Sequence, residues 1–426
     1  MNRECSTQLT ITFSRTIILL TAWIVAHNPS PLFSSESLSL PSRFVVSCGE
    51  HDRTDTPISV SIPELEHRTD QVRLIEIHGN KTTDVPVQIR GGDTMRMFWI
   101  LRGTTPAKSR RTFELREGQP VRASKVETIA TENYLEIKRD RASILRYNTS
   151  AVDTPKGVDP KYSRAAYIHP VWTPSGKIVT DHLNPASDHP HQIGIWSAYT
   201  KTKFQGRKPN FWSYFDGGAE TRLVECTSKT SGPVFGGFRV RHEHVDRTGT
   251  RPVVALIEDW DVRVWNVGGA EARYWLCDVT SLTQCATDDA VTVAKDYYGG
   301  FAIRGAQDWV KGCEALTSEG KTRINGNHTR VRWCDVFGKV DDAIAGLSVM
   351  SHPQNFRFSE PVRIHPKLPY FCFTTAHLGQ WSIDPGKPHR IHYRLVIHDG
   401  PPVAGEIQRI WRDFAEPPRV ERLSDE

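Results

Sequence analysis

Histidines are concentrated in one short stretch of this 426-residue sequence. His169, His182, His189 and His191 lie close together in the chain, and Asp188 directly precedes the last pair. An imidazole can serve as acid, base or metal ligand near neutral pH, and a carboxylate can fix the tautomer of a neighbouring imidazole. On an extended segment the side chains of His189 and His191 would face the same way. We predict that His169, Asp188, His189 and His191 are catalytic.

The same imidazoles allow two other interpretations. A metal ion would need a third ligand beside His189 and His191, and His169 or Asp188 could supply it. A cupin-like iron site would also place a Glu shortly after the His-x-His pair, but no Glu occurs between Gln192 and Ala219. The sequence therefore requires no cofactor, although it is compatible with a divalent metal on His169, His189 and His191. In the remaining interpretation these histidines only hydrogen-bond to the backbone of a proline-rich loop.

Further polar and aromatic side chains suit the recognition of a small polar ligand. His352 and Asn355 follow a strand-like segment, and an amide offers a donor and an acceptor to ligand hydroxyls. Tyr298 and Arg304 flank a pair of glycines, where the backbone can approach a ligand closely. The flat ring of Trp196 could support a sugar ring. We predict that Trp196, Tyr298, Arg304, His352 and Asn355 bind the substrate.

Composition and periodicity indicate strands. Twelve Trp, 17 Phe and 11 Tyr accompany 30 Gly and 27 Pro, whereas Met occurs four times. Short alternating segments such as 72–77, 134–138 and 391–397 are separated by turns, and only 404–414 has helical spacing. We predict an all-β protein. A small β-sandwich domain (residues 44–120) would precede a large antiparallel β-sandwich domain (residues 121–414), and a tail (residues 415–426) would follow. The large domain could have a galactose-mutarotase-like architecture.

The N-terminus bears on the cellular compartment. Arg3 and Arg15 precede an apolar run over residues 16–26, followed by helix-breaking residues from Asn28. This run is shorter than the roughly 20 residues of a membrane span, which predicts a secretory signal peptide over residues 1–26, with an uncleaved anchor as the alternative. The mature protein would then be exported to the periplasm, cell envelope or extracellular space, without integral membrane association. Eight Cys without a CxxC pair disfavour a zinc knuckle or a dense disulfide scaffold.

Charge and missing motifs exclude several classes of function. The net charge is +5 and is dispersed, so no nucleic-acid partner is expected. The sequence contains no P-loop, no GxGxxG after a strand, no HExxH and no GxSxG. Phosphate transfer and serine hydrolysis are therefore disfavoured, and a saccharide or another small molecule is the expected partner.

Several motifs resemble a bacterial family of unknown function that automatic naming often labels methane oxygenase PmoA. The resemblance covers roughly residues 42–400. It rests on Tyr-x-His-Pro-x-x-Thr-Pro-x-Gly around His169, Asp-His-Pro-His at 188–191, Tyr-Gly-Gly-Phe at 298–301, His352-Pro353 with Asn355, and His398-Asp399-Gly400. The family carries a third imidazole after Asp-His-Pro-His, where this chain has Gln192, which cannot shuttle a proton. The resemblance implies an exported β-sandwich protein from a saccharide-degrading setting.

Three hypotheses of function follow. The first is an exported enzyme that uses His acid/base chemistry on a saccharide as a lyase, epimerase or hydrolase. The second is a non-catalytic carbohydrate-binding or envelope protein. The third is the metal-dependent oxygenase that the family label implies, although membrane methane monooxygenase subunits are largely transmembrane helices and this chain has one short apolar run.

Overall fold

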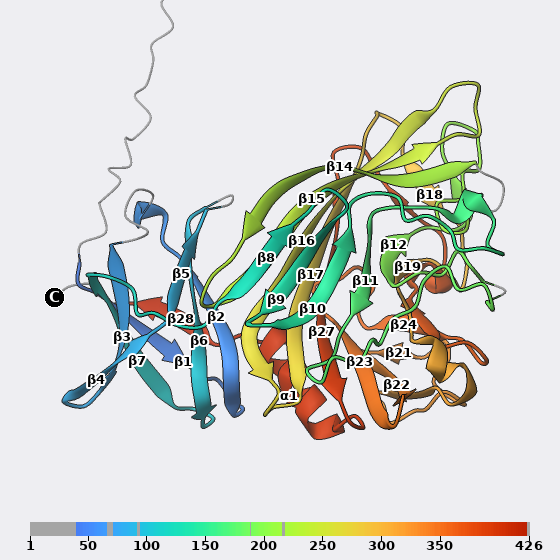
Figure 1. Cartoon of the computed structure of the whole chain (residues 1–426). Helices are drawn as coiled ribbons and strands as arrows, with labels where there is room; N and C mark the ends of the chain where they lie inside the picture. Colours follow the sequence, from blue (N-terminus) through green and yellow to red (C-terminus); the bar gives the residue numbers. More distant parts are fainter. Residues whose placement is uncertain (1–39, 66–70, 92–93, 188, 215–217, 424–426) are drawn as a thin grey trace, which may run out of the picture. The chain divides into compact units, whose positions relative to one another are not determined.

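The computed structural model describes residues 40–65, 71–91, 94–187, 189–214 and 218–423 (Figure 1). Nearly all regular structure in these residues is antiparallel β-sheet, which confirms the predicted all-β fold. The segment predicted as a signal peptide lies outside the described residues. No helix in the described ranges is long and apolar enough to cross a membrane.

The N-terminal part contains two sheets around a common apolar cluster that includes Phe44, Trp99 and Phe113. One sheet has the order β28 (Arg419–Arg422), β1 (Ser42–Ser47), β7 (Arg110–Glu117), β3 (Val72–His78) and β4 (Lys81–Val85). The other has the order β2 (Arg53–Ser61), β6 (Arg96–Thr105) and β5 (Val87–Arg90). Strand β28 comes from the C-terminal tail and pairs with β1, so this sheet joins the two ends of the described chain.

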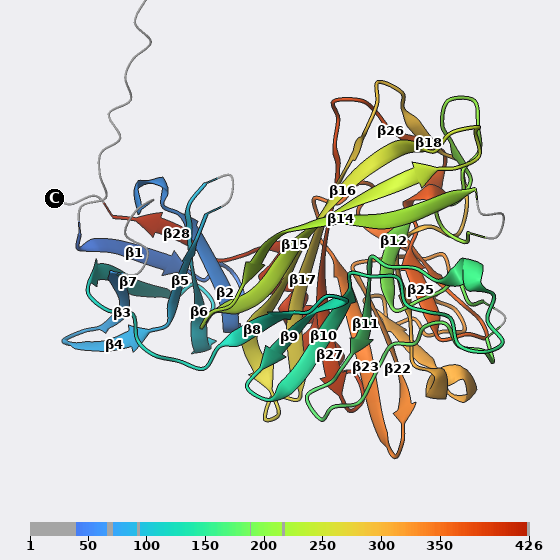
Figure 2. The same ribbon diagram turned by 45° about the horizontal axis from the view of Figure 1, so that its top comes forward.

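The larger part is built from a nine-stranded and an eight-stranded sheet (Figure 2). The first runs β21 (Arg330–Val331), β24 (Glu360–Ile364), β25 (Tyr370–Phe373), β19 (Gly300–Arg304), β12 (Ile195–Ala198), β11 (Tyr167–Val171), β10 (Ala142–Asn148), β9 (Tyr134–Arg139) and β8 (Val126–Ala130). The second runs β14 (Ala219–Thr230), β15 (Phe235–Asp246), β16 (Val253–Gly269), β17 (Tyr274–Cys285), β27 (His389–Asp399), β23 (Ala343–Ser351), β22 (Trp333–Val340) and β20 (Glu314–Thr317). A small third sheet contains β13 (Thr202–Lys203), β18 (Val291–Val293) and β26 (Trp381–Ile383).

One helix and four short 3₁₀ turns complete the described elements. Helix α1 (Ala404–Ala415) confirms the helix expected at 404–414, and its Ile407 and Trp411 pack in an apolar cluster with Trp265 and Val396 of the eight-stranded sheet. The buried Asp413 of α1 accepts a hydrogen bond of 3.0 Å from Arg53 in β2, which ties the helix to the N-terminal part. The 3₁₀ turns are η1 (Pro63–Leu65), η2 (Pro160–Tyr162), η3 (Gln307–Lys311) and η4 (Thr375–Leu378).

Strand alternation gives the nine-stranded sheet two different faces. In β19, Phe301 and Ile303 belong to the apolar core shared with the eight-stranded sheet. Their neighbours Ala302 and Arg304 therefore point to the opposite face. In β12 the same alternation sends Trp196 to that opposite face. We call this face, which is directed away from the sandwich core, the second face; it carries His169, Trp196 and Arg304 among the predicted site residues.

Candidate functional site

Three histidine rings lie close together beside the nine-stranded sheet. His189 and His191 lie just before β12, and His365 directly follows β24. The ring centroid of His189 is 5.5 Å from that of His191 and 5.8 Å from that of His365. His191 is buried, whereas His189 and His365 are half-buried. We call these residues the histidine triplet, and its two half-buried rings give it access to solvent.

Arg304 at the end of β19 anchors the loop that carries the first two of these histidines. Its guanidinium is buried and donates to Gln192 Oε1 at 3.2 Å and to Ser187 Oγ at 3.3 Å. Asp181 Oδ2 lies 3.9 Å from its Nε. Burial raises the pKa of Asp181, and the charge of Arg304 partly opposes this increase. The position at which the resembling family has an imidazole is therefore occupied by Gln192, whose side-chain oxygen accepts a hydrogen bond from Arg304.

Aromatic rings connect the triplet to Trp196 and Tyr298. Tyr370 of β25 pairs with Arg304, and its ring centroid lies 6.4 Å from that of His365. The same ring lies 6.1 Å from Trp196 and 6.0 Å from Tyr298. Trp196 and Tyr370 are buried, whereas Tyr298 is half-buried. A ligand arriving from solvent would reach Tyr298, and Trp196 would support the site from behind.

His169 lies on the second face in a separate pair. Its ring centroid is 3.9 Å from that of His182, and its Nδ1 is 2.9 Å from Thr180 Oγ1. Tyr167 Oη lies 2.7 Å from His182 Nδ1. Burial lowers the pKa of His169 well below its usual value, and that of His182 to about 4. Both imidazoles are therefore neutral at pH 7.

His365 presents a defined tautomer to the site. Its Nδ1 accepts hydrogen bonds from the backbone N–H groups of Lys367 at 3.1 Å and Leu368 at 2.8 Å. The proton of the neutral ring must therefore be on Nε2, which can donate to a ligand. Burial and the nearby charge of Arg363 lower the pKa of His365 to about 4. The triplet can thus offer hydrogen-bond donors, and the half-buried His189 is the member best placed to exchange a proton.

Two predicted substrate-binding residues lie elsewhere. The ring centroid of His352 is 5.1 Å from that of His392 and 4.9 Å from that of Phe414 in α1. Asn355 is buried and donates to Glu360 Oε2 at 3.1 Å and to the His392 carbonyl oxygen at 3.0 Å. Their loop folds back on β27, so the structure does not bring these two residues to the triplet. Asp188 lies outside the described residues.

The alternative metal ligands are not assembled. Within residues 40–423, apart from the ranges left undescribed, no three His, Cys, Asp or Glu side chains are arranged to hold a metal ion. The ring of His169 contacts that of His182 in a tilted arrangement, and the third ring of the triplet is that of His365. The cysteines at the seven described positions are free thiols.

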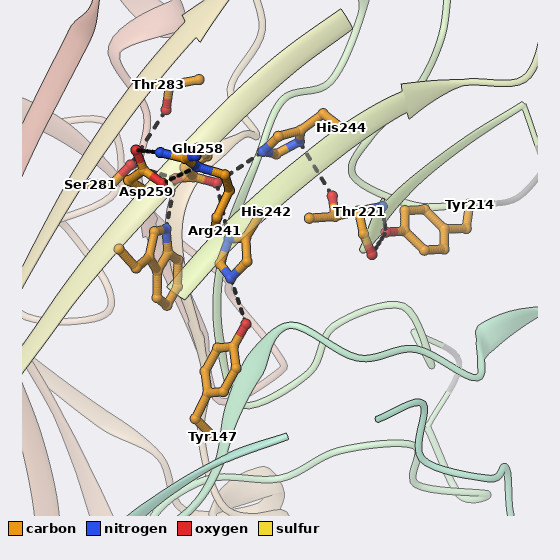
Figure 3. Close-up of polar contacts among 11 residues, drawn as sticks. Tyr147, Tyr214, Thr221, Arg241, His242, His244, Glu258, Asp259, Ser281 and Thr283 are labelled. Carbon is orange, nitrogen blue, oxygen red and sulfur yellow. Dashed lines mark hydrogen bonds and ion pairs between the residues drawn. The ribbon is translucent and has the colours of Figure 1, made fainter. Parts of the chain in front are cut away.

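A second polar group lies inside the sandwich (Figure 3). Glu258 of β16 accepts from Trp260 Nε1 at 2.7 Å and lies 2.9 Å from His244 Nε2 and 3.6 Å from His242 Nδ1. His242 Nε2 is 2.5 Å from Tyr147 Oη. Burial alone would raise the pKa of Glu258, but hydrogen bonds from the two histidines lower it below its usual range. We call Glu258, His242, His244, Tyr147 and Trp260 the Glu258 network; none is more than 1% exposed.

Sequence reasoning missed His365 and its neighbour Arg363. The signal was present in β24, where Val362 and Ile364 enter the sandwich core. Because side chains alternate along a strand, Arg363 and His365 must face the other way. The segment Glu360-Pro361 at the start of β24 obscures this short strand in the sequence, since proline is unusual in strands.

Comparisons with known proteins show a family but no activity. No curated protein matches the sequence. Two solved structures from Enterococcus faecalis are similar, a protein in glycosyl hydrolase family 38 and an alpha-mannosidase, both at 12% identity and TM-score 0.43. Each match covers 90% of this chain but only 47% and 46% of the other chains, less than half of their length. The model of the Family of unknown function (DUF6807) matches residues 134–412, and the chain therefore belongs to this family.

Proposed function

We propose that this chain is an exported carbohydrate-active enzyme that binds a saccharide at the histidine triplet. The observation that carries the proposal is the meeting of His189 and His191 with His365 of a separate segment. Arg304 donates to the neighbouring Gln192, and the ring of Tyr370 lies between those of His365 and Tyr298. Rings and hydrogen-bond donors together suit a sugar, which offers flat C–H faces and hydroxyl edges. The apolar run at residues 16–26 supports export.

The roles follow from accessibility. His189 is half-buried between two other imidazoles, so it can reach a substrate and exchange a proton with it. His365 would donate from Nε2 to a hydroxyl. Arg304 holds the loop through Ser187 and Gln192, and is a positioning residue in this scheme. Such groups suit lyase, epimerase or hydrolase chemistry.

The test is an activity screen of the full chain on a panel of polysaccharides and oligosaccharides, with products separated by chromatography and identified by mass. We expect the double variant His189→Ala, His191→Ala to lose turnover while the melting temperature stays close to that of wild type. His78→Ala, an exposed histidine in β3, is the matched control and should keep full activity.

Each outcome separates the hypotheses. A double variant with full activity on a true substrate would contradict the proposal. Binding of glycans by wild type without any product would support a non-catalytic carbohydrate-binding protein. Stoichiometric Fe, Cu or Zn in the purified protein, with loss of turnover when the metal is removed, would support the metal-dependent oxygenase.

A further inference from the structure

A run of rings continues from the triplet across neighbouring segments. The guanidinium carbon of Arg363 lies 5.2 Å from the ring centroid of Tyr298 and 5.5 Å from that of Tyr297. Tyr297 lies 5.8 Å from His328, and His328 stacks on His377 at 4.3 Å. We call Arg363, Tyr298, Tyr297, His328 and His377 the ring track. It begins two residues from His365 in the chain and therefore extends the triplet.

The ring track is accessible. Tyr297 is 47% exposed, and its other four members are half-buried. By contrast, the aromatic rings behind them, such as Trp196 and Tyr370, are buried and serve the packing of the second face. Planar side chains supplied by four separate segments offer successive stacking surfaces. A ligand with several consecutive rings would use such an arrangement better than a single sugar.

Arg363 gives this surface its charge preference. Its Nη2 donates to Tyr298 Oη at 3.3 Å and its Nη1 to the Ile364 carbonyl oxygen at 3.2 Å. Its buried Nε has no hydrogen-bond partner in the described part of the chain, and no carboxylate there forms an ion pair with the Arg363 guanidinium. The charge of Arg363 is therefore held in place by two tyrosine rings and is not neutralised. A planar guanidinium matches a carboxylate in a bidentate manner.

The nearby charges reinforce this preference. The charges of Arg304 and Arg323 lower the pKa of His365, as the charge of Arg363 does. The nearest acidic neighbour of Tyr297 in sequence, Asp296, is buried, and its carboxylate lies 3.5 Å from Lys201 Nζ. The surface thus combines rings with the positive charge of Arg363.

We propose that the ring track binds an extended acidic saccharide, a polyuronate, and that Arg363 holds a uronate carboxylate. This inference rests on the proposed function and names its substrate class. A carboxylate can form two parallel hydrogen bonds with the guanidinium, which a hydroxyl or a methyl ester cannot. Lysine would keep the charge but lose this geometry.

The experiment measures binding of the full chain to polygalacturonate, to the same polymer with its carboxylates methyl-esterified, and to dextran sulfate. We expect polygalacturonate to bind about tenfold or more tightly than the ester, because the ester cannot form the charge-assisted hydrogen bonds of the carboxylate. Arg363→Lys should lose about tenfold of that affinity and should bind the ester as wild type does. Arg390→Lys, at an exposed arginine on β27, is the matched control and should bind like wild type.

Several results would overturn the inference. Equal affinity for the polymer and its ester would exclude carboxylate recognition, and dextran sulfate bound as tightly as polygalacturonate would reduce the site to general attraction of anions. If Arg363→Lys does not fold, Tyr297→Ala at the exposed ring tests the track, and unchanged polygalacturonate affinity in it would contradict the proposal. Turnover of neutral saccharides alone would refute this inference and leave the proposed function intact, whereas no binding or turnover of any saccharide would refute both.

Discussion

Two His-x-His pairs in this chain have opposite surroundings. His189 and His191 lie in a turn beside the nine-stranded sheet, and the first of them is half-buried. His242 and His244 lie within β15 and contact Glu258 inside the sandwich. The same spacing thus occurs once at a site that solvent reaches and once in the interior, where no reactant can arrive.

The register explains the interior pair. His242 pairs with Glu258, Glu258 with Thr283, and Thr283 with His389, so one polar row crosses four strands of the eight-stranded sheet. Buried polar groups of this kind are tolerated only when each has partners. We conclude that the Glu258 network stabilises and specifies the packing of the two sheets, whereas we propose that the histidine triplet binds a ligand.

Removing the charge of Glu258 should cause the largest loss in the free energy of unfolding. Glu258→Gln keeps the volume but replaces an oxygen that accepts hydrogen bonds by an NH₂ group that faces other donors. We expect a loss of about 3–5 kcal/mol in the free energy of unfolding, as for other buried pairs that lose one partner. Urea denaturation measures it.

Glu127→Gln on β8 is the matched control, because Glu127 is exposed and should change stability by less than about 0.5 kcal/mol. A loss below about 1 kcal/mol in Glu258→Gln would show that the network is not a structural element, since breaking a buried charge pair normally costs more. The interior pair would then have to be considered as a functional site.

A smaller loss of stability is expected at Asn355, a residue that we predicted to bind substrate but that lies away from the histidine triplet. Its side-chain NH₂ donates to Glu360, to Ser351 and to the carbonyl oxygen of His392. Its side-chain oxygen accepts a hydrogen bond from the backbone N–H of His392. Asn355→Ala should therefore cost about 2 kcal/mol of unfolding free energy, because buried groups lose their partners. Saccharide affinity should stay at the wild-type value.

The exposed neighbour Gln354→Ala is the control and should leave both quantities unchanged. Reduced saccharide affinity in a stable Asn355→Ala variant would instead return this residue to the binding site.

Much of the fold could be predicted because it depends on local patterns. Period-two alternation identified segments such as 134–138 and 391–397, which are strands β9 and β27, and helical spacing identified α1. The pairing of β28 with β1 could not be predicted, since residues 419–422 are mostly charged and their partner lies at the other end of the chain. Such a pairing depends on tertiary contacts and leaves little trace in composition.

The candidate site shows the same division. His189 and His191 are close in sequence, and their ring centroids lie 5.5 Å apart. His365 and Arg363 were missed because β24, which contains Arg363 and ends just before His365, is five residues long. The order of the strands in the sheet brings His365 close to His189, and this order is not visible in the sequence. His352 and Asn355 resemble site residues in the sequence because polar groups after a strand can bind ligands or close a loop with equal ease.

Two histidines, His365 at the candidate site and His398 of β27, should contribute to stability with opposite pH dependence. Burial and the charge of Arg363 lower the pKa of His365 to about 4, so the folded protein resists a proton that the unfolded chain accepts below about 6.5. Stability contributed by His365 is therefore lost as the pH falls from about 6.5 to about 4. His398 of β27 behaves in the opposite way. Its Nε2 lies 2.9 Å from the buried Asp335 and its Nδ1 lies 3.0 Å from the Gly400 carbonyl oxygen, so both nitrogens must donate.

Burial opposes this charge, yet Asp335 raises the pKa of His398 above its usual value. The stability from His398 is complete below about pH 6.5 and is lost as the pH rises through its folded-state pKa. Urea midpoints between pH 4.5 and 9 should therefore show a smaller acid loss in His365→Asn than in wild type, and a smaller alkaline loss in His398→Gln. Equal slopes in wild type and both variants would mean that these two histidines do not differ in protonation, and the contrast between His365 at the site and His398 beside Asp335 would fail.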